Sequence, residues 1–209
     1  MGADFEREFS QAFTGKGWRT GISPREAVDR WRRFAGDCTA GFAWDLDDYL
    51  DDLTLRSVLS EVLPELAGPE ADGLRDAIER TDRAVRKVLT HEAFTDFPND
   101  EWWLRNCPAY AARRFCEEFE SAYGVRIRPQ SRFDDDVAEL ARLTAGGLGP
   151  ADACLRFRSS GRSAATADGL FLRAAKEALG LHRKPADALW SWLTKEITDA
   201  EFRAALGDA

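Results

Sequence analysis

Residues 42–55 read Phe42-Ala-Trp-Asp-Leu-Asp-Asp-Tyr-Leu-Asp-Asp-Leu-Thr-Leu55, and this stretch combines helix signals with an unusual concentration of charge. Asp45 predicts the N-cap of a helix over about residues 46–52, because a carboxylate there accepts a hydrogen bond from the first turn. Thr54 predicts a second N-cap. The helix after it has apolar residues at helical spacing, namely Leu55, Val58, Leu59, Val62, Leu63 and Leu66. The stretch therefore predicts two helices in succession.

The same stretch carries five carboxylates and neither Lys nor Arg; they are Asp45, Asp47, Asp48, Asp51 and Asp52. Like charges this close repel one another and lower stability unless water, a metal ion or a cationic partner relieves them. In one interpretation the helix dipole favours the aspartates of the first turn and the others point into water. In the other they form an acidic contact surface for a basic partner, with Trp44 and Tyr49 as aromatic anchors.

Helical periodicity continues on both sides of this stretch. Ser23-Pro24-Arg25-Glu26 combines an N-cap Ser, a Pro at the first helical position and the Glu of a capping box. Apolar residues of the segment 70–90 alternate by three and four, as in a helix bundle. Pro108 predicts the start of another helix, closed by Gly124. We therefore predict an all-α fold, with an N-terminal helical bundle followed by a smaller C-terminal helical domain.

The balance of charge changes near residue 128. Residues 1–128 carry 25 acidic and 18 basic side chains, whereas residues 129–209 carry 12 and 11. Helices are expected after this point at 134–145, where the aspartates at 134–136 provide the cap, and from Ser163 to about 179. Thr198 and Glu201 predict a last capping box. We predict two domains, an acidic helical bundle over residues 1–128 and a smaller helical domain over residues 129–209.

The composition excludes several classes of protein. No apolar run approaches the roughly 20 residues that span a bilayer, and the acidic N-terminus lacks the apolar core of a signal peptide, so we expect a cytoplasmic protein without a membrane partner. The net charge of −8 argues against nucleic acid as a partner, because such a chain repels polyanions. Four cysteines without a Cys-x-x-Cys pair and two histidines outside ligand spacing predict neither a metal site nor a cofactor.

One motif raises the question of catalysis. Asp47-Asp48-Tyr-Leu-Asp51 matches the Asp-Asp-x-x-Asp pattern with which all-helical isoprenoid synthases hold Mg²⁺ against a diphosphate, and hard cations prefer oxygen ligands. Those enzymes need a second acidic motif across a deep cavity. The best counterpart here, Asn99-Asp100-Glu101, lacks the Ser or Thr and the Glu that should follow it. A nucleophile elbow and a Ser-His-Asp order are also missing, so we predict no enzyme and keep a Mg-dependent diphosphate enzyme as the remote alternative.

Three segments carry a resemblance to a known group of proteins. They are Asp29-Arg-Trp-Arg-Arg-Phe34, the stretch from Trp44 to Leu59, and Trp102-Trp103 with the later Pro108. Residues 29–108 thereby resemble small helical bacterial proteins encoded beside polymorphic or contact-dependent toxins. Asp51 stands where Asn is expected in the Tyr-x-Asn/Asp-Asp-Leu-x-x-Arg turn of that group. Its members are taken to be immunity proteins, so the resemblance implies an inhibitor of a toxin.

We therefore expect a non-catalytic immunity- or antitoxin-type inhibitor that docks an acidic helical surface on a basic protein such as a nuclease toxin. Its expected contact residues are Trp44, Asp45, Asp47, Asp48, Tyr49, Asp51 and Asp52, with Asp100, Glu101 and Trp102 beside them. Adjacent tryptophans on a helix point about 100° apart, so one can lie in the core while the other is partly exposed. We expect core packing for at least one of Trp102 and Trp103, and an exposed one would extend the acidic surface. The alternative is a helical adaptor or regulator that binds through residues 129–209.

Overall fold

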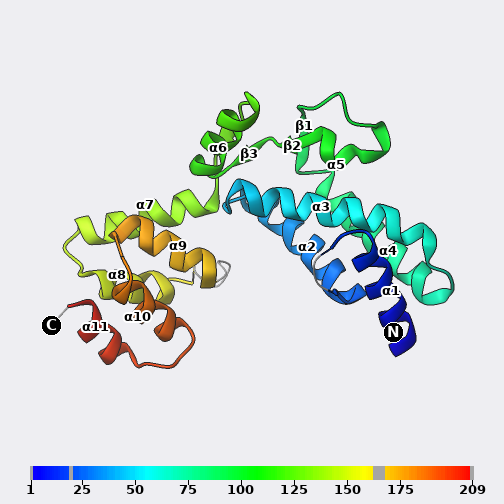
Figure 1. The fold of residues 1–209 in the computed structure, drawn as a ribbon. Coiled ribbons are helices and arrows are strands. Elements are labelled where there is room, and N and C mark those ends of the chain that lie inside the picture. Colours follow the sequence, from blue (N-terminus) through cyan, green and yellow to red (C-terminus); the bar gives the residue numbers. More distant parts are fainter. Residues whose placement is uncertain (1, 19–20, 162–167, 208–209) are drawn as a thin grey trace. The chain divides into compact units, whose positions relative to one another are not determined.

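The computed structural model describes residues 2–18, 21–161 and 168–207 (Figure 1). Helices dominate these residues, which confirms the predicted all-α fold. The chain divides into two compact units, unit 1 (Met1–Gln130) and unit 2 (Ser131–Ala209), and each is described by itself. The boundary predicted between residues 128 and 129 falls within the short strand β4 (Arg128–Pro129). Across the described ranges, every helix is too short or too polar to span a membrane.

Unit 1 is built on four long helices. They are α1 (Ala3–Gly15), α2 (Pro24–Ala40), α3 (Leu46–Val62), which runs into the 3₁₀ helix η1 (Leu63–Glu65), and α4 (Pro69–Val85). The capping box predicted at the start of α2 is present. The Ser23 hydroxyl accepts from the Glu26 N–H at 3.2 Å, and the Glu26 carboxylate accepts from the Ser23 N–H at 2.8 Å. These two hydrogen bonds satisfy two of the N–H groups that a helix start leaves without intrahelical partners.

Helix α3 corrects one prediction and confirms another. Asp45 is the N-cap, and its carboxylate accepts from the Asp48 N–H at 3.0 Å. Thr54 does not begin a second helix, because α3 continues without interruption to Val62. The Thr54 hydroxyl instead donates to the Leu50 carbonyl at 2.8 Å, one turn earlier in the same helix. Such back-bonding lets a Thr lie inside a helix, so the residue type alone is an ambiguous start signal.

The second half of unit 1 adds short strands around two further helices. Strand β1 (Leu89–Glu92) pairs antiparallel with β2 (Asn106–Pro108), and the 3₁₀ helix η2 (Asn99–Glu101) and α5 (Trp102–Arg105) lie between them in the chain. Strand β3 (Tyr110–Ala111) pairs parallel with β4, with α6 (Arg113–Tyr123) between them. The helix start predicted at Pro108 is wrong, because this residue is paired in β2. Gly124 does end α6, with a left-handed φ of 69°.

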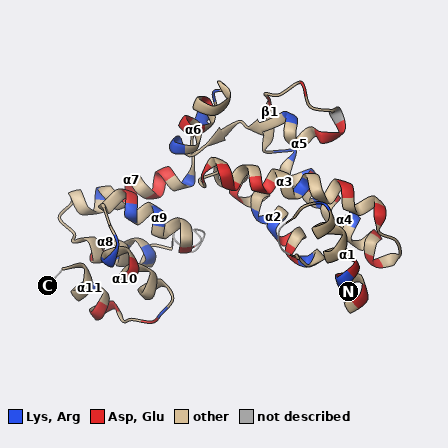
Figure 2. Ribbon diagram, viewed as in Figure 1, with Lys and Arg blue, Asp and Glu red and all other residues tan. Residues whose placement is uncertain are grey.

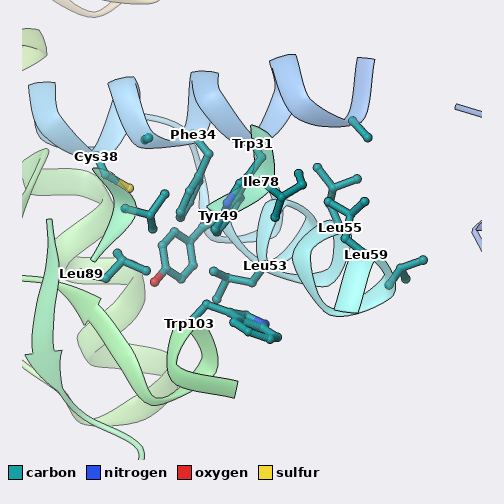
Figure 3. Packing of buried hydrophobic residues seen from close by; sticks show 14 of the residues in the cluster. Trp31, Phe34, Cys38, Tyr49, Leu53, Leu55, Leu59, Ile78, Leu89 and Trp103 are labelled. Atoms are coloured by element: carbon teal, nitrogen blue, oxygen red, sulfur yellow. The ribbon is translucent and has the colours of Figure 1, made fainter. Parts of the chain in front are cut away.

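An aromatic core joins these elements of unit 1. Trp31 and Phe34 of α2 stack with ring centroids 4.9 Å apart. The Tyr49 ring of α3 lies 5.5 Å from Phe34 and 5.3 Å from Phe115 of α6. Figure 3 shows Tyr49 beneath Phe34 and beside Leu53. Rings at these separations in tilted or edge-to-face geometry pack favourably, so the core fixes α3 between α2 and α6.

Unit 2 is described as five helices. They are α7 (Arg132–Ala145), α8 (Pro150–Ser159), α9 (Asp168–Leu179), α10 (Lys184–Leu193) and α11 (Asp199–Leu206). Ser131, rather than the aspartates after it, caps α7 by accepting from the Asp134 N–H at 3.0 Å. The capping box predicted at Thr198 is present at α11. The cap predicted at Ser163 lies outside the described residues.

Candidate binding site

The start of α3 and the outer face of α6 border an open hollow of about 660 Å³ in unit 1. We call it the acidic hollow; its lining includes Asp45, Leu46, Asp47, Arg114, Glu117 and Glu118. Figure 2 shows the acidic residues gathered over the start of α3. The hollow therefore combines part of the acidic stretch with two glutamates from a helix about seventy residues later in the chain.

Two of the four carboxylates in the acidic hollow are held by the protein itself. Asp45 caps α3, as described above, and Glu118 accepts from the Leu46 N–H at 3.2 Å and from Arg114 Nε at 2.8 Å. The helix dipole favours both anions, since they lie at the N-terminal end of α3. Much of the charge at this position thus has a structural explanation in helix capping.

The other two carboxylates of the acidic hollow are different. Asp47 and Glu117 are exposed, and neither forms a hydrogen bond or ion pair with other residues that the structure describes. Arg114, the one cation among the named lining residues, is already engaged by Glu118 at 2.8 Å. The hollow therefore presents negative charge to solvent, which attracts a cationic group and steers its approach.

The far end of the acidic stretch is partly neutralised, contrary to the expectation from its sequence. Arg30 of α2 pairs with Asp52, with Nε 2.7 Å from Oδ1, and its Nη2 lies 4.0 Å from Asp51. Burial raises the pKa of Asp52, while Arg30 opposes that rise and the negative charge of Asp48 adds to it. Asp52 is thus a half-buried partner of α2, whereas the Asp51 side chain remains 74% exposed. A cation from a neighbouring helix could not be read from residues 42–55 alone.

The two predicted aromatic anchors on this stretch are held by the fold. Tyr49 is only 2% exposed, so its ring packs in the core and does not contact a partner. Its hydroxyl donates to the Asn106 carbonyl at 3.5 Å, and burial raises its pKa well above the ordinary value. Trp44 is half-buried and donates from Nε1 to Asp37 Oδ2 at 3.1 Å. Burial raises the Asp37 pKa, and this hydrogen bond opposes the rise.

The second predicted group, Asp100, Glu101 and Trp102, lies at η2 and α5 and does not line the acidic hollow. Both tryptophans of α5 are buried, so Trp102 does not extend the acidic surface, which corrects its prediction as a contact residue. Trp102 is 6% exposed under the Arg86 guanidinium, whose carbon lies 3.9 Å from the ring centroid. Asp100 and Glu101 border a separate pocket that also contains Arg56, and we call it the Arg56 pocket. The predicted single acidic surface is thus divided between two concavities.

The described residues give the diphosphate-enzyme alternative no geometric support. Within them, no three His, Cys, Asp or Glu side chains are grouped so as to hold a metal ion. The four cysteines are buried. Burial raises the pKa of Cys107 to about 12 and that of Cys38 well above its ordinary value. A thiol with a raised pKa stays protonated and is a poor nucleophile.

Sequence reasoning missed Glu117 and Glu118 as members of the site. The alternation of Phe115 and Phe119 does predict which face of α6 is buried, and so predicts that Glu117 faces solvent. What the sequence does not contain is the position of α6 beside the start of α3. That position depends on long-range contacts, such as the bridge between Phe42 and Ala111 and the packing of Phe42 on Phe115 at 5.1 Å.

Comparison with known proteins adds no relative to this description. No family model, no curated protein and no solved structure matches the chain. The resemblance to immunity-type proteins therefore rests on the three sequence segments that carry it.

Proposed function

We propose that the chain is a non-catalytic binding protein of the immunity or antitoxin type. In this proposal the acidic hollow of unit 1 docks a basic protein, such as a nuclease toxin, in the cytoplasm of a bacterium. An acidic surface that covers a basic cleft gains rapid association by electrostatic steering. The resemblance of residues 29–108 supplies the class of partner, and the charge of the hollow is compatible with it.

One observation carries the proposal. Asp47 and Glu117 come from different helices, lie on the same open hollow and have no cation paired with them among the described residues. Two like charges on one concave surface repel each other, so their position is unfavourable for the isolated protein. A cationic partner group would relieve that repulsion and bind at the same time. The revised contact set is therefore Asp45, Asp47, Glu117 and Glu118.

A second candidate places binding on unit 2, as an adaptor or regulator. Trp190 of α10 is 45% exposed, and Trp is among the residue types enriched at the centres of protein interfaces. This candidate predicts that charge changes in the acidic hollow leave partner binding intact. The two candidates can therefore be separated by changing one unit at a time in the full chain.

The experiment uses the product of the reading frame next to this gene as the probe. Production of that product should arrest bacterial growth, and co-production of the full chain should restore it. Asp47→Lys with Glu117→Lys should abolish the rescue and lower affinity for the purified product by about thirtyfold or more, since truncating or reversing central charges in such interfaces costs about 2 kcal/mol or more. Calorimetry at several salt concentrations should show a shallower salt dependence for the same variant.

The matched control makes the same change of charge on unit 2. Asp135 of α7 and Glu177 of α9 are both exposed, and Asp135 lies in the first turn of its helix, as Asp47 does in α3. Asp135→Lys with Glu177→Lys should leave the rescue unchanged. Far-ultraviolet circular dichroism checks that both variants keep their helices. Rescue that survives the change in the acidic hollow refutes this site, and rescue lost only with the control favours the unit 2 candidate.

A further inference from the structure

The Arg56 pocket is a second concavity of unit 1, with a volume of about 580 Å³. It lies between the C-terminal end of α3, helix α4 and the segment η2–α5. Apolar side chains of Leu63 and Ile78 and the Trp103 indole form part of its wall. Because Leu46 lines the acidic hollow and Ser60 lines the Arg56 pocket, the two sites are about 20 Å apart along α3 at 1.5 Å per residue.

The inner wall of the pocket contains a buried ion pair. Arg56 is 9% exposed, and its Nε and Nη2 donate to the two oxygens of Asp82 at 3.0 and 2.8 Å. Trp31 Nε1 donates to the same Asp82 Oδ1 at 2.8 Å. The Arg56 guanidinium also lies over the Trp103 ring, 4.1 Å from its centroid. Desolvating two charges is costly, so a pair of this kind is expected to have every polar atom matched.

One atom of this pair is not matched. Arg56 Nη1 is buried and has no hydrogen-bond partner among the described residues. The Trp103 ring offers electrostatic attraction but no oxygen acceptor. Both Asp82 oxygens already accept hydrogen bonds. A buried donor without an acceptor costs free energy, so Nη1 points to an acceptor that comes from another molecule.

The outer rim of the pocket is acidic. Glu79 and Asp100 are exposed and Glu101 is half-buried, and none of the three is paired with another described residue. Arg75 lies on the same rim but is engaged, since it donates to the Asp72 carboxylate at 2.7 Å and to the carbonyls of Leu63 and Leu66. The rim therefore favours a cation, while the inner wall needs an oxygen acceptor.

We propose that the Arg56 pocket binds a basic segment of a protein partner. The segment's Lys or Arg side chain lies along the half-buried Leu63 and places its cation among Glu79, Asp100 and Glu101. A main-chain carbonyl of the same segment accepts from Arg56 Nη1, after a side chain of the pocket wall has moved aside to uncover that atom. A peptide supplies both groups, whereas a simple cation or anion supplies one. The identity of the bound segment rests on the proposed function, because the segment belongs to the same basic partner. Binding in the Arg56 pocket itself does not depend on the acidic hollow.

The test uses capped tripeptides and the full chain. The probes are acetyl-Gly-Lys-Gly-amide, its Arg counterpart, its uncharged norleucine counterpart and butylammonium, which has the cation without a carbonyl. Nuclear magnetic resonance at low salt follows the indole N–H signals of Trp103, which donates to Ser57 Oγ at 3.0 Å, and of Trp31. The Lys and Arg peptides should shift both signals and approach saturation at about 10 mM, a range typical of weak fragments. The norleucine peptide and butylammonium should bind at least about fivefold more weakly.

Two variants locate the binding. Glu79→Gln with Asp100→Asn and Glu101→Gln should weaken the Lys peptide about fivefold, because three rim charges are lost. Asp135→Asn with Glu177→Gln, which removes two exposed charges of unit 2, should leave it unchanged. Equal binding of the norleucine peptide, an unaffected rim variant or no saturable shift overturns the proposal. These shifts do not depend on toxin neutralisation, so a failed rescue with intact peptide binding refutes the proposed function alone.

Discussion

Units 1 and 2 are both helical and each buries a carboxylate, Asp82 and Asp136, but they differ in the burial of the ion pairs compared below. Unit 1 buries the Arg56–Asp82 pair and leaves unpaired carboxylates around two concavities. In unit 2 the pairs Arg142–Glu139 and Arg203–Asp152 lie at the surface. Exposed pairs contribute little to stability, and a buried pair is costly unless fully satisfied. The charge pattern of unit 1 is therefore harder to explain by folding alone, and binding offers the missing reason.

The largest expected difference between the units comes from breaking one ion pair in each. Asp82→Asn leaves the Arg56 charge buried without its counter-ion and should lower the free energy of unfolding by about 3–5 kcal/mol. Asp152→Asn removes the half-buried partner of Arg203 and should cost less, about 1 kcal/mol. Urea unfolding followed by tryptophan fluorescence measures both. Similar losses in the two variants would refute the contrast between the units.

The next largest loss of unfolding free energy should be equal in the two units, because a helix in each unit begins with a capping box. Ser23→Ala in α2 and Thr198→Ala in α11 each remove an N-cap acceptor and should cost about 1 kcal/mol. Amide hydrogen exchange at Glu26 and Glu201, whose N–H groups lose their acceptors, reports the local effect. If one N-cap substitution lowers the free energy of unfolding and the other does not, tertiary packing and not capping stabilises the helix start in the unaffected unit.

These capping boxes are also where sequence reasoning succeeded, because the whole signal lies within four residues. Ser23 and Glu26, and likewise Thr198 and Glu201, meet through local geometry that does not depend on the rest of the fold. Thr54 shows the limit of local signals, since its hydroxyl has a second stable partner inside a helix. Strands β1 and β2 were not predicted, because residues 89–92 find their hydrogen bonds in residues 106–108.

The site was predicted less well than the fold, for a related reason. Asp45 and Asp47 do line a hollow, but its other wall comes from Glu117 and Glu118 of α6. Tyr49 was misread because an aromatic residue among aspartates has the composition of a contact surface, whereas one face of α3 is buried against α2 and α6. The density of charged residues in a sequence predicts the sign of the charge on a surface. Tertiary packing decides which residues of that stretch remain accessible to a partner.

The pH dependence of stability should sharpen the distinction between buried and capping carboxylates within unit 1. Burial raises the pKa of Asp37, so the folded state binds that proton more tightly and gains stability as the pH falls through the folded-state pKa. Hydrogen bonds from Ser23 lower the pKa of Glu26, so its contribution is present above the unfolded-state pKa and lost as the pH falls through the folded-state value. As the pH falls, Asp37 should add to the free energy of unfolding, and Asp37→Asn should remove that increase. Glu26 should subtract from the free energy of unfolding over its own titration range, and Glu26→Gln should remove that decrease. Urea unfolding at a series of pH values measures the two slopes, which must change in opposite directions.

The smallest expected effect is the most informative about the acidic hollow. Asp47→Asn with Glu117→Gln relieves repulsion but also removes an anion from the first turn of α3, so stability should change by less than about 0.5 kcal/mol. Asp135→Asn with Glu177→Gln makes the same exposed change in unit 2 and should behave alike. A loss above about 1 kcal/mol in the first variant alone would mean that these acids serve folding. If the first variant folds as well as the parent chain and yet no longer docks its partner, folding cannot account for the two carboxylates, and the difference between the units lies in binding.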